Sequence, residues 1–134
     1  MENMEVADFK YRELTYKIIG CAMEVHKVLG PGFQEYVYQN ELAIEMKSAD
    51  IHFEKEFEMK IFYKGDTVGL RRVDFFIEKC ISLEIKAKSE LLDEHLAQAL
   101  NYLEASNIEV GLLFNFGAKS LQHKRLLKKK YKPL

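Results

Sequence analysis

The chain has 134 residues, of which 48% are apolar and 31% charged, and its net charge is −1. This length fits one domain, residues 1–134, and the balance of apolar and charged residues excludes an intrinsically disordered chain. The sequence has no run of about 18 apolar residues, so no membrane span is predicted. The first ten residues have a net negative charge and no apolar stretch, so no secretory signal is predicted.

Two helices are predicted at the start of the chain. Residues 11–29 place apolar side chains three or four positions apart, which is the spacing of one helix face. Gly30-Pro31-Gly32 ends this helix, because glycine suits the left-handed C-terminal position and proline prevents continuation. A second helix is expected over residues 34–48, with Leu42 and Met46 on its apolar face.

Three strands are predicted next, because the apolar residues change to an alternating pattern. The alternation covers residues 56–63, and Lys64-Gly65-Asp66 then forms a turn. Strands follow at about residues 68–77 and 80–87. Short connections between consecutive strands predict an antiparallel meander.

The last third of the chain predicts a helix, a buried strand and a final helix. Asp93 is the expected N-cap of a helix over about residues 93–105. Residues 108–114 form a short apolar segment, and the last helix is expected from about Lys119. The order α-α-β-β-β-α-β-α predicts an α/β domain with a mixed sheet flanked by helices, in which the crossover helix pairs the last strand in parallel.

Basic residues gather in a C-terminal tail from about residue 118. After Glu109 the sequence has seven basic residues and no acidic residue. The first 109 residues therefore contain 13 basic and 21 acidic residues, which gives them a net charge of −8. The tail could contact phosphates, or it could be a solvated terminus that aids solubility. Its basic residues are Lys119, Lys124, Arg125, Lys128, Lys129, Lys130 and Lys132.

The two cysteines, Cys21 and Cys80, lie far apart and lack metal-ligand spacing. We expect two free thiols in a reducing cytoplasm, with a single disulfide as the alternative.

The third predicted strand carries the residues with the clearest chemistry. Alternation places Ser82, Glu84 and Lys86 on one face, and Asp74 lies on the preceding strand. A two-residue turn would place Asp74 and Glu84 on opposite faces, whereas the three-residue connection 78–80 pairs Ile77 with Ile81 and brings the two acids to one face. We therefore predict an odd or bulged connection.

Two adjacent carboxylates repel each other unless a cation lies between them. Their hard oxygen ligands suit Mg²⁺ or Mn²⁺. Such a metal polarises a phosphoryl oxygen and lowers the pKa of a bound water, while Lys86 could orient that water or neutralise developing charge. The alternative is that Glu84 and Lys86 belong to an exposed strand face.

Further residues strengthen the metal–phosphate interpretation by a family resemblance. Gly32-x-x-Glu35-x-x-Tyr38 resembles the signature of the GxxExxY proteins, a small family of the PD-(D/E)xK nuclease superfamily. The resemblance runs from about residue 14 to residue 117. It also includes residues 25–32, Asp74 with Glu84-Ile85-Lys86, residues 98–102 and residues 111–117.

The resemblance implies a restriction-endonuclease-like fold and a set of site roles. Asp74 and Glu84 look like the metal-binding acids, Lys86 like the superfamily lysine and Glu35 like an additional metal-binding acid. Gln98 and Tyr102 resemble a Gln-x-x-x-Tyr motif that supports the site and the nucleic-acid backbone, although Gln98 could equally be a solvated helix residue.

Three more residues are secondary candidates besides Tyr102. Arg72 shares the predicted face of Asp74 and could meet a phosphate or pair with an acid. His95 could touch phosphate. Tyr38 is expected to have a structural role more than a catalytic one.

These observations predict a Mg²⁺-dependent nuclease that acts on DNA or RNA by metal-activated water attack. The alternatives are a non-catalytic nucleic-acid-binding module and a protein-interaction module on the same fold. We expect no membrane partner. A homodimer would let so small a domain reach both strands of a duplex.

Overall fold

The computed structural model describes residues 2–129, with residues 2–10 described as backbone alone. Its eight elements are α1 (Glu2–Leu29), α2 (Glu35–Ser48), β1 (Phe53–Tyr63), β2 (Asp66–Ile77), β3 (Ile81–Lys86), α3 (Asp93–Ser106), β4 (Val110–Asn115) and β5 (Gln122–Leu127). None of the helices in the described part of the chain has the length and hydropathy needed to span a bilayer.

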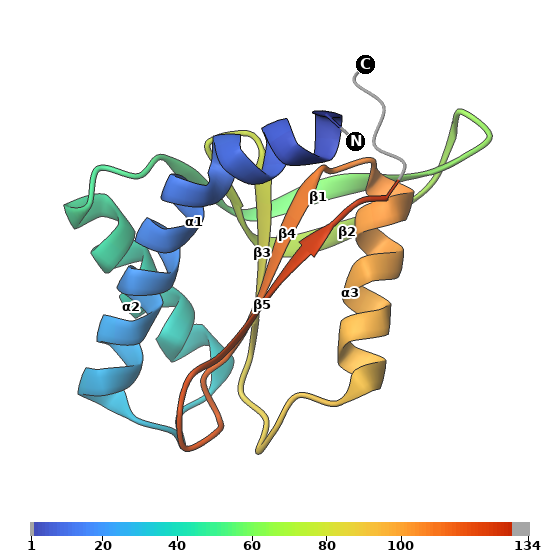
Figure 1. Ribbon diagram of the computed structural model, residues 1–134. Coiled ribbons are helices and arrows are strands. Elements are labelled where there is room, and N and C mark those ends of the chain that lie inside the picture. Colours follow the sequence, from blue (N-terminus) through green and yellow to red (C-terminus); the bar gives the residue numbers. More distant parts are fainter. Residues whose placement is uncertain (1, 130–134) are drawn as a thin grey trace.

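The five strands form one mixed sheet in the order β1-β2-β3-β4-β5. Neighbouring strands are antiparallel except β3 and β4, which are parallel because α3 crosses over between them. Helices α1 and α2 cover one face of the sheet and α3 covers the other (Figure 1). The predicted α/β fold with a mixed sheet and a parallel crossover pair is confirmed.

The main core lies between the sheet and the pair α1–α2. Ile81, Leu83 and Ile85 of β3 are buried there, and Phe114 of β4 joins them. Burial of each such side chain contributes about 1.5–3 kcal/mol, so the register of β3 is strongly fixed. Because strand side chains alternate, the same burial turns Ser82, Glu84 and Lys86 to the face that α3 covers.

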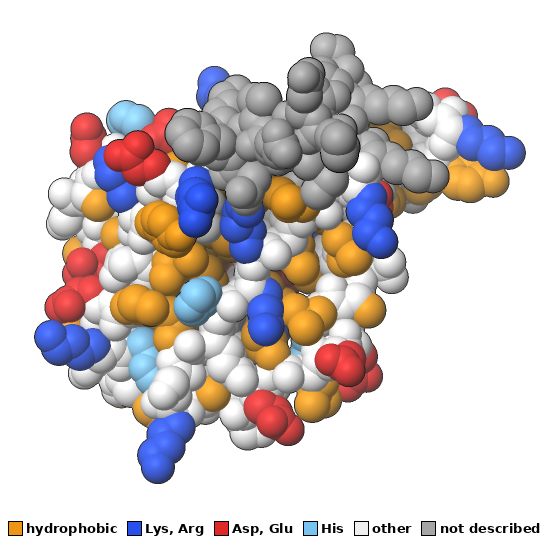
Figure 2. Space-filling model, in the orientation of Figure 1, with side chains coloured by type: hydrophobic (Ala, Val, Ile, Leu, Met, Phe, Trp, Pro, Cys, Tyr) orange, Lys and Arg blue, Asp and Glu red, His pale blue; other side chains and the backbone are white. Residues whose placement is uncertain are grey.

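The predicted final helix is wrong, because the segment after Lys119 forms strand β5. The six residues of β5 pair with all six residues of β4, from Asn115↔Gln122 to Val110↔Leu127. Lysine and leucine favour a helix locally, but β4 is buried along its length and its backbone groups require partners. Figure 2 shows the face with β5, where Lys, Arg and His side chains lie among apolar ones and acidic side chains lie toward the margin. Lys130 and Lys132 of the predicted basic tail lie outside the described residues.

Other boundaries differ by smaller amounts. The first helix begins at Glu2, before the predicted residue 11, and β1 begins at Phe53, before the predicted residue 56. Asp93 is inside α3 and is not its N-cap. The N-cap is Leu92, whose backbone N–H donates to Nδ1 of His95 at 3.0 Å.

A buried asparagine fixes the segment that follows β3. Asn115 is fully buried, and its side chain accepts from the backbone N of Lys88 at 2.8 Å and donates to the carbonyl of Lys88 at 2.9 Å. Gly117 lies directly against the same segment, because a Cβ at this position would lie 2.4 Å from the Lys88 carbonyl oxygen. Together these contacts hold the chain just beyond Lys86.

The Gly117→Ala substitution therefore tests this close approach. The added methyl group meets rigid backbone, so we expect the free energy of unfolding to fall by about 3 kcal/mol in urea denaturation. Gly20→Ala is the matched control: Gly20 is exposed within α1, and a Cβ there would meet nothing within 4 Å. It should stabilise the protein by about 0.5–1 kcal/mol. Equal stability of Gly117→Ala and the wild type would contradict the packing described here.

Candidate metal and phosphate site

The connection between β2 and β3 decides which side chains can meet. Ile77 pairs with Ile81, so the connection is the three-residue segment predicted from strand parity, and that prediction is confirmed. Glu78 and Lys79 adopt left-handed backbone conformations, with φ values of 50° and 57°. Phe76↔Ser82 and Phe75↔Leu83 continue the register toward Asp74 and Glu84.

Asp74 lies where β2 and β3 part. The ladder between the two described strands ends at Phe75↔Leu83. Beyond it, Oδ2 of Asp74 accepts a hydrogen bond from the backbone N of Ile85 at 2.7 Å. The carboxylate thus satisfies a backbone donor of β3, while Gln39 of α2 donates to the Asp74 carbonyl at 3.3 Å. These bonds fix the Asp74 side chain against β3, the strand that carries Glu84 and Lys86.

Burial raises the pKa of Asp74 to about 6, against an ordinary value of 3.8. The hydrogen bond from Ile85 opposes this rise, the negative charges of Glu84 and Glu35 add to it, and the positive charge of Lys86 opposes it. Asp74 is therefore within electrostatic reach of three of the residues predicted to share its site. A carboxylate that is costly to ionise in this way favours a nearby cation.

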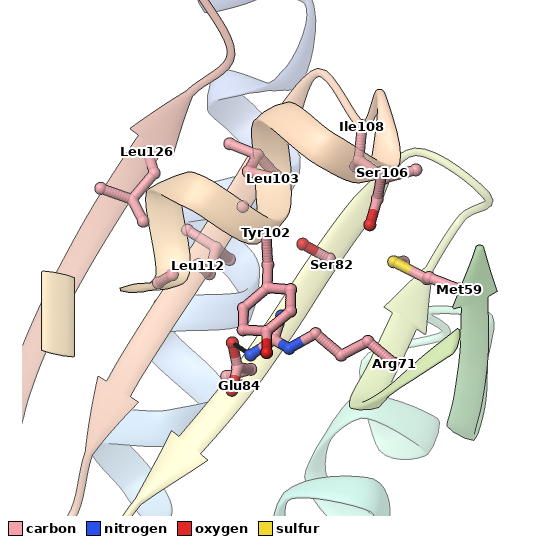
Figure 3. A pocket seen from close by; sticks show the side chains of 12 residues that line it. Met59, Arg71, Ser82, Glu84, Tyr102, Leu103, Ser106, Ile108, Leu112 and Leu126 are labelled. Atoms are coloured by element: carbon pink, nitrogen blue, oxygen red, sulfur yellow. Dashed lines mark hydrogen bonds and ion pairs between the residues drawn. The ribbon is translucent and has the colours of Figure 1, made fainter. Parts of the chain in front are cut away.

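Glu84 already has a cationic partner in Arg71. The Arg71 guanidinium donates through Nη2 to Oε1 of Glu84, and it lies over the ring of Tyr102 with 4.0 Å between Cζ and the ring centroid (Figure 3). Tyr102, predicted to support the site, is thus linked to Glu84 through an arginine that the sequence analysis did not select.

Arg71 makes the acid pairing that was considered for Arg72. Arg71 pairs across the ladder with Met59, and both line the pocket beneath α3. Arg72 pairs with Glu58, and both are exposed. The ladder is irregular near this level, since Glu56 has a φ of 55° and no partner between Lys55↔Phe75 and Phe57↔Val73. Asp74 likewise has no partner between these two pairs, so the regular pairing is interrupted on both strands, and alternation counted from Asp74 does not identify the inward-facing arginine.

Glu35 is placed by a turn that Tyr38 holds. The Tyr38 hydroxyl donates to the Gly30 carbonyl at 2.6 Å and accepts from the Phe33 backbone N at 3.2 Å. Its ring is fully buried and stacks on Phe116 at 4.7 Å between centroids. The expected structural role of Tyr38 therefore agrees with its contacts: it fixes the entry into α2, whose first residue is the exposed Glu35.

Gln98 and His95 lie farther from the acids. Gln98 is exposed on α3 and lines a surface groove with Asn101 and Tyr102. No hydrogen bond among the described residues joins Gln98 to Asp74 or Glu84. His95 accepts a hydrogen bond at the start of α3 through Nδ1, which gives it a structural function there.

The far end of the site contains a network that sequence reasoning missed. Lys86 is the last residue of β3, and its carbonyl accepts from the backbone N of Phe116 at 2.9 Å. Asn115, opposite Lys86 in the parallel ladder, binds the Lys88 backbone and also donates to Gln122 at 2.9 Å. The signal was a polar side chain at the end of an otherwise apolar strand, because buried polar groups are almost always hydrogen-bonded.

The donor set suits a hard cation that retains water. Among residues 11–129, whose side chains the structure describes, no group of three His, Cys, Asp or Glu side chains that could hold a metal is assembled. Asp74 and Glu84 supply two carboxylates, and Mg²⁺ commonly binds proteins through one or two carboxylates with water and substrate phosphate completing its shell. The residues fit such a site, and they do not form an all-protein cage.

Comparison with known proteins adds two findings. A family model described as the PD-(D/E)XK nuclease superfamily matches residues 12–126. The crystal structure of SSO0001 aligns with a TM-score of 0.54 and 23% sequence identity, covering 69% of this chain and 48% of that one. This chain therefore spans about half the length of SSO0001, and at this identity the likeness is one of fold. No curated protein matches the chain significantly.

The raised pKa of Asp74 predicts that Asp74→Asn stabilises the metal-free protein at pH 7.5. In the unfolded chain the carboxyl ionises near its ordinary pKa, whereas in the folded protein it holds its proton up to about pH 6. The free energy of unfolding consequently falls as the pH rises from about 4 to 6. At every higher pH the protein keeps the full loss of stability that ionised Asp74 causes. Asparagine removes the charge and can still accept from Ile85.

At pH 7.5 we expect the free energy of unfolding of Asp74→Asn to exceed that of the wild type by about 1–2 kcal/mol. This value is lower than the full pKa shift implies, because Asp74 is partly exposed to solvent. Urea denaturation without divalent metal measures the difference, which should shrink at pH 4.5. A variant less stable than the wild type at pH 7.5 would show that the ionised carboxylate is stabilising, contrary to this account.

Proposed function

This chain belongs to the PD-(D/E)XK nuclease superfamily, and we propose on that basis that it is a metal-dependent phosphodiesterase acting on DNA or RNA. The observation that carries the proposal is Asp74, a largely buried carboxylate that interacts electrostatically with Glu84, Glu35 and Lys86. Such an arrangement lowers the stability of the folded protein, because burial and neighbouring negative charges both disfavour ionisation of the carboxylate. The cost is understandable where a cation and a phosphate bind.

Nucleases of this superfamily generally use divalent metals. Asp74 and Glu84 would hold Mg²⁺ or Mn²⁺, and Glu35 at the start of α2 would be the additional acid. When bound, the metal would polarise a phosphoryl oxygen and lower the pKa of a coordinated water.

The chain's own residues would orient the reaction and neutralise charge. Lys86 would orient the attacking water or stabilise the negative charge that develops on the phosphate. Asp74 must lose its proton to bind a metal, so metal affinity should rise as the pH increases through about 6. Gln98 and Tyr102 would support the nucleic-acid backbone, and exposed Lys124 on β5 would add a contact that specifies no sequence.

The spacing Gly32-x-x-Glu35-x-x-Tyr38 supports assignment to the GxxExxY group within the superfamily. The Tyr38 hydroxyl gives this spacing a physical reason, since it binds the turn that precedes α2 and so positions Glu35.

Hydrolysis of labelled single-stranded DNA, duplex DNA and RNA with Mg²⁺ or Mn²⁺ tests the proposal. We expect metal-dependent cleavage of at least one substrate, abolished by EDTA and reduced about 100-fold or more in Asp74→Ala and Lys86→Ala, because each removes a group that acts on the reacting phosphate or its metal. Lys47→Ala is the control of matched charge, since Lys47 is exposed in the last turn of α2 and should leave the rate unchanged.

Equal cleavage by wild type and Lys86→Ala would identify a contaminating nuclease. The pairing of Glu84 with Arg71 favours one alternative, a non-catalytic nucleic-acid-binding module. Salt-sensitive binding that needs no metal and is unchanged in Asp74→Ala, without cleavage, would establish that alternative.

A further inference from the structure

We infer that Arg71 is the resident counter-cation of Glu84: it occupies this carboxylate in the metal-free protein, and a divalent ion must compete with it. The inference rests on the proposed function, because it assigns Glu84 to the metal. It identifies Arg71 as a positioning residue that sets metal affinity through Glu84.

The contact between Arg71 and Glu84 is shielded from water. Each of the two side chains is 17% exposed, so solvent screens their attraction less than it screens a surface ion pair. A partly buried pair of this kind is costly to break by removing one partner, because the other charge is left without compensation. Arg71 therefore supplies the positive charge that lies against Glu84 in the metal-free protein.

Tyr102 holds the guanidinium in place. The Cζ atom of Arg71 lies 4.0 Å from the centroid of the Tyr102 ring, which is well within the range of a cation–π contact. Figure 3 shows the arginine reaching from β2 beneath Tyr102 to Glu84 on β3. The pocket that these residues line has a free volume of about 10 Å³, close to the least that holds one water. The guanidinium thus fills the space beside Glu84 on the α3 side.

Arginine suits this role better than lysine. Its planar fork can donate to a carboxylate while its face stacks on an aromatic ring, whereas an ammonium group is a strongly hydrated point charge. The positive charge of Arg71 also opposes metal binding, because it repels a divalent cation that approaches the same carboxylate. Metal binding at Glu84 is consequently weaker with Arg71 present than without it.

Titration of metal-free protein with Mn²⁺, followed by calorimetry, tests the inference. Arg71→Gln removes the charge and leaves an amide that can still donate to Glu84. We expect it to bind Mn²⁺ about tenfold more tightly than the wild type, because a nearby repulsive charge is lost. Arg72→Gln is the matched control: it removes the same charge from the next residue, which is exposed, and should change the affinity less than about twofold.

Thermal unfolding gives a second readout that does not depend on activity. Without metal, Arg71→Gln should have a lower Tm than the wild type, because Glu84 loses the positive charge that compensates it. Saturating Mn²⁺ should raise the Tm of the variant by more than it raises that of the wild type. If Arg71→Gln does not fold, Arg71→Lys should fold and bind Mn²⁺ more tightly than the wild type, but by less than tenfold. Lysine keeps the charge that repels the metal and loses the fork and the stacking that hold this charge against Glu84.

The possible failures are distinguishable. Mn²⁺ binding that disappears in Glu84→Gln but is equal or weaker in the folded Arg71 variants would overturn the role of Arg71 and leave the proposed function standing. Absence of Mn²⁺ binding in both wild type and Arg71→Gln at millimolar concentration would overturn both.

Discussion

The alternation of side chains along β3 is the constraint on which the site depends. Ile81, Leu83 and Ile85 are buried against α1 and α2, and their burial fixes the register of the central strand. Glu84 and Lys86 must then face the opposite side of the sheet. A slip of one residue would bury both charges in the main core, so the apolar contacts that stabilise the fold also determine where its chemistry can occur.

The three-residue connection 78–80 extends this constraint to the neighbouring strand. It brings Asp74 beside β3, where its carboxylate accepts the Ile85 N–H. Different groups offset the two negative charges. The positive charge of Lys86 and the hydrogen bond from the Ile85 amide favour the ionised form of Asp74, and Arg71 forms an ion pair with Glu84. A site built in this way gives up stability for function, because neutral side chains would be cheaper to bury at the same positions.

Much of this arrangement could be predicted from the sequence, and the failures have physical causes. The connection 78–80 followed from parity, because strand side chains alternate strictly when the ladder is regular. The same reasoning selected Arg72 and missed Arg71, because the pairing of β1 with β2 is interrupted at Glu56 and Asp74, and no residue pattern in the sequence marks that interruption. Strand β5 was predicted as a helix, since local propensity favours one and only β4 supplies the backbone partners that override it. Asn115 and Gly117 lie just beyond the predicted strand 108–114, and their contacts with residues 87–88 could not be predicted because they depend on tertiary structure.

The central claim is that Asp74 and Glu84 form a divalent-metal site, and crystals soaked with Mn²⁺ test it most directly. We predict an anomalous density peak coordinated by carboxylate oxygens of both residues, and its loss in Asp74→Asn crystals soaked in the same way. Well-ordered wild-type crystals with no peak at these carboxylates in millimolar Mn²⁺ would contradict the account.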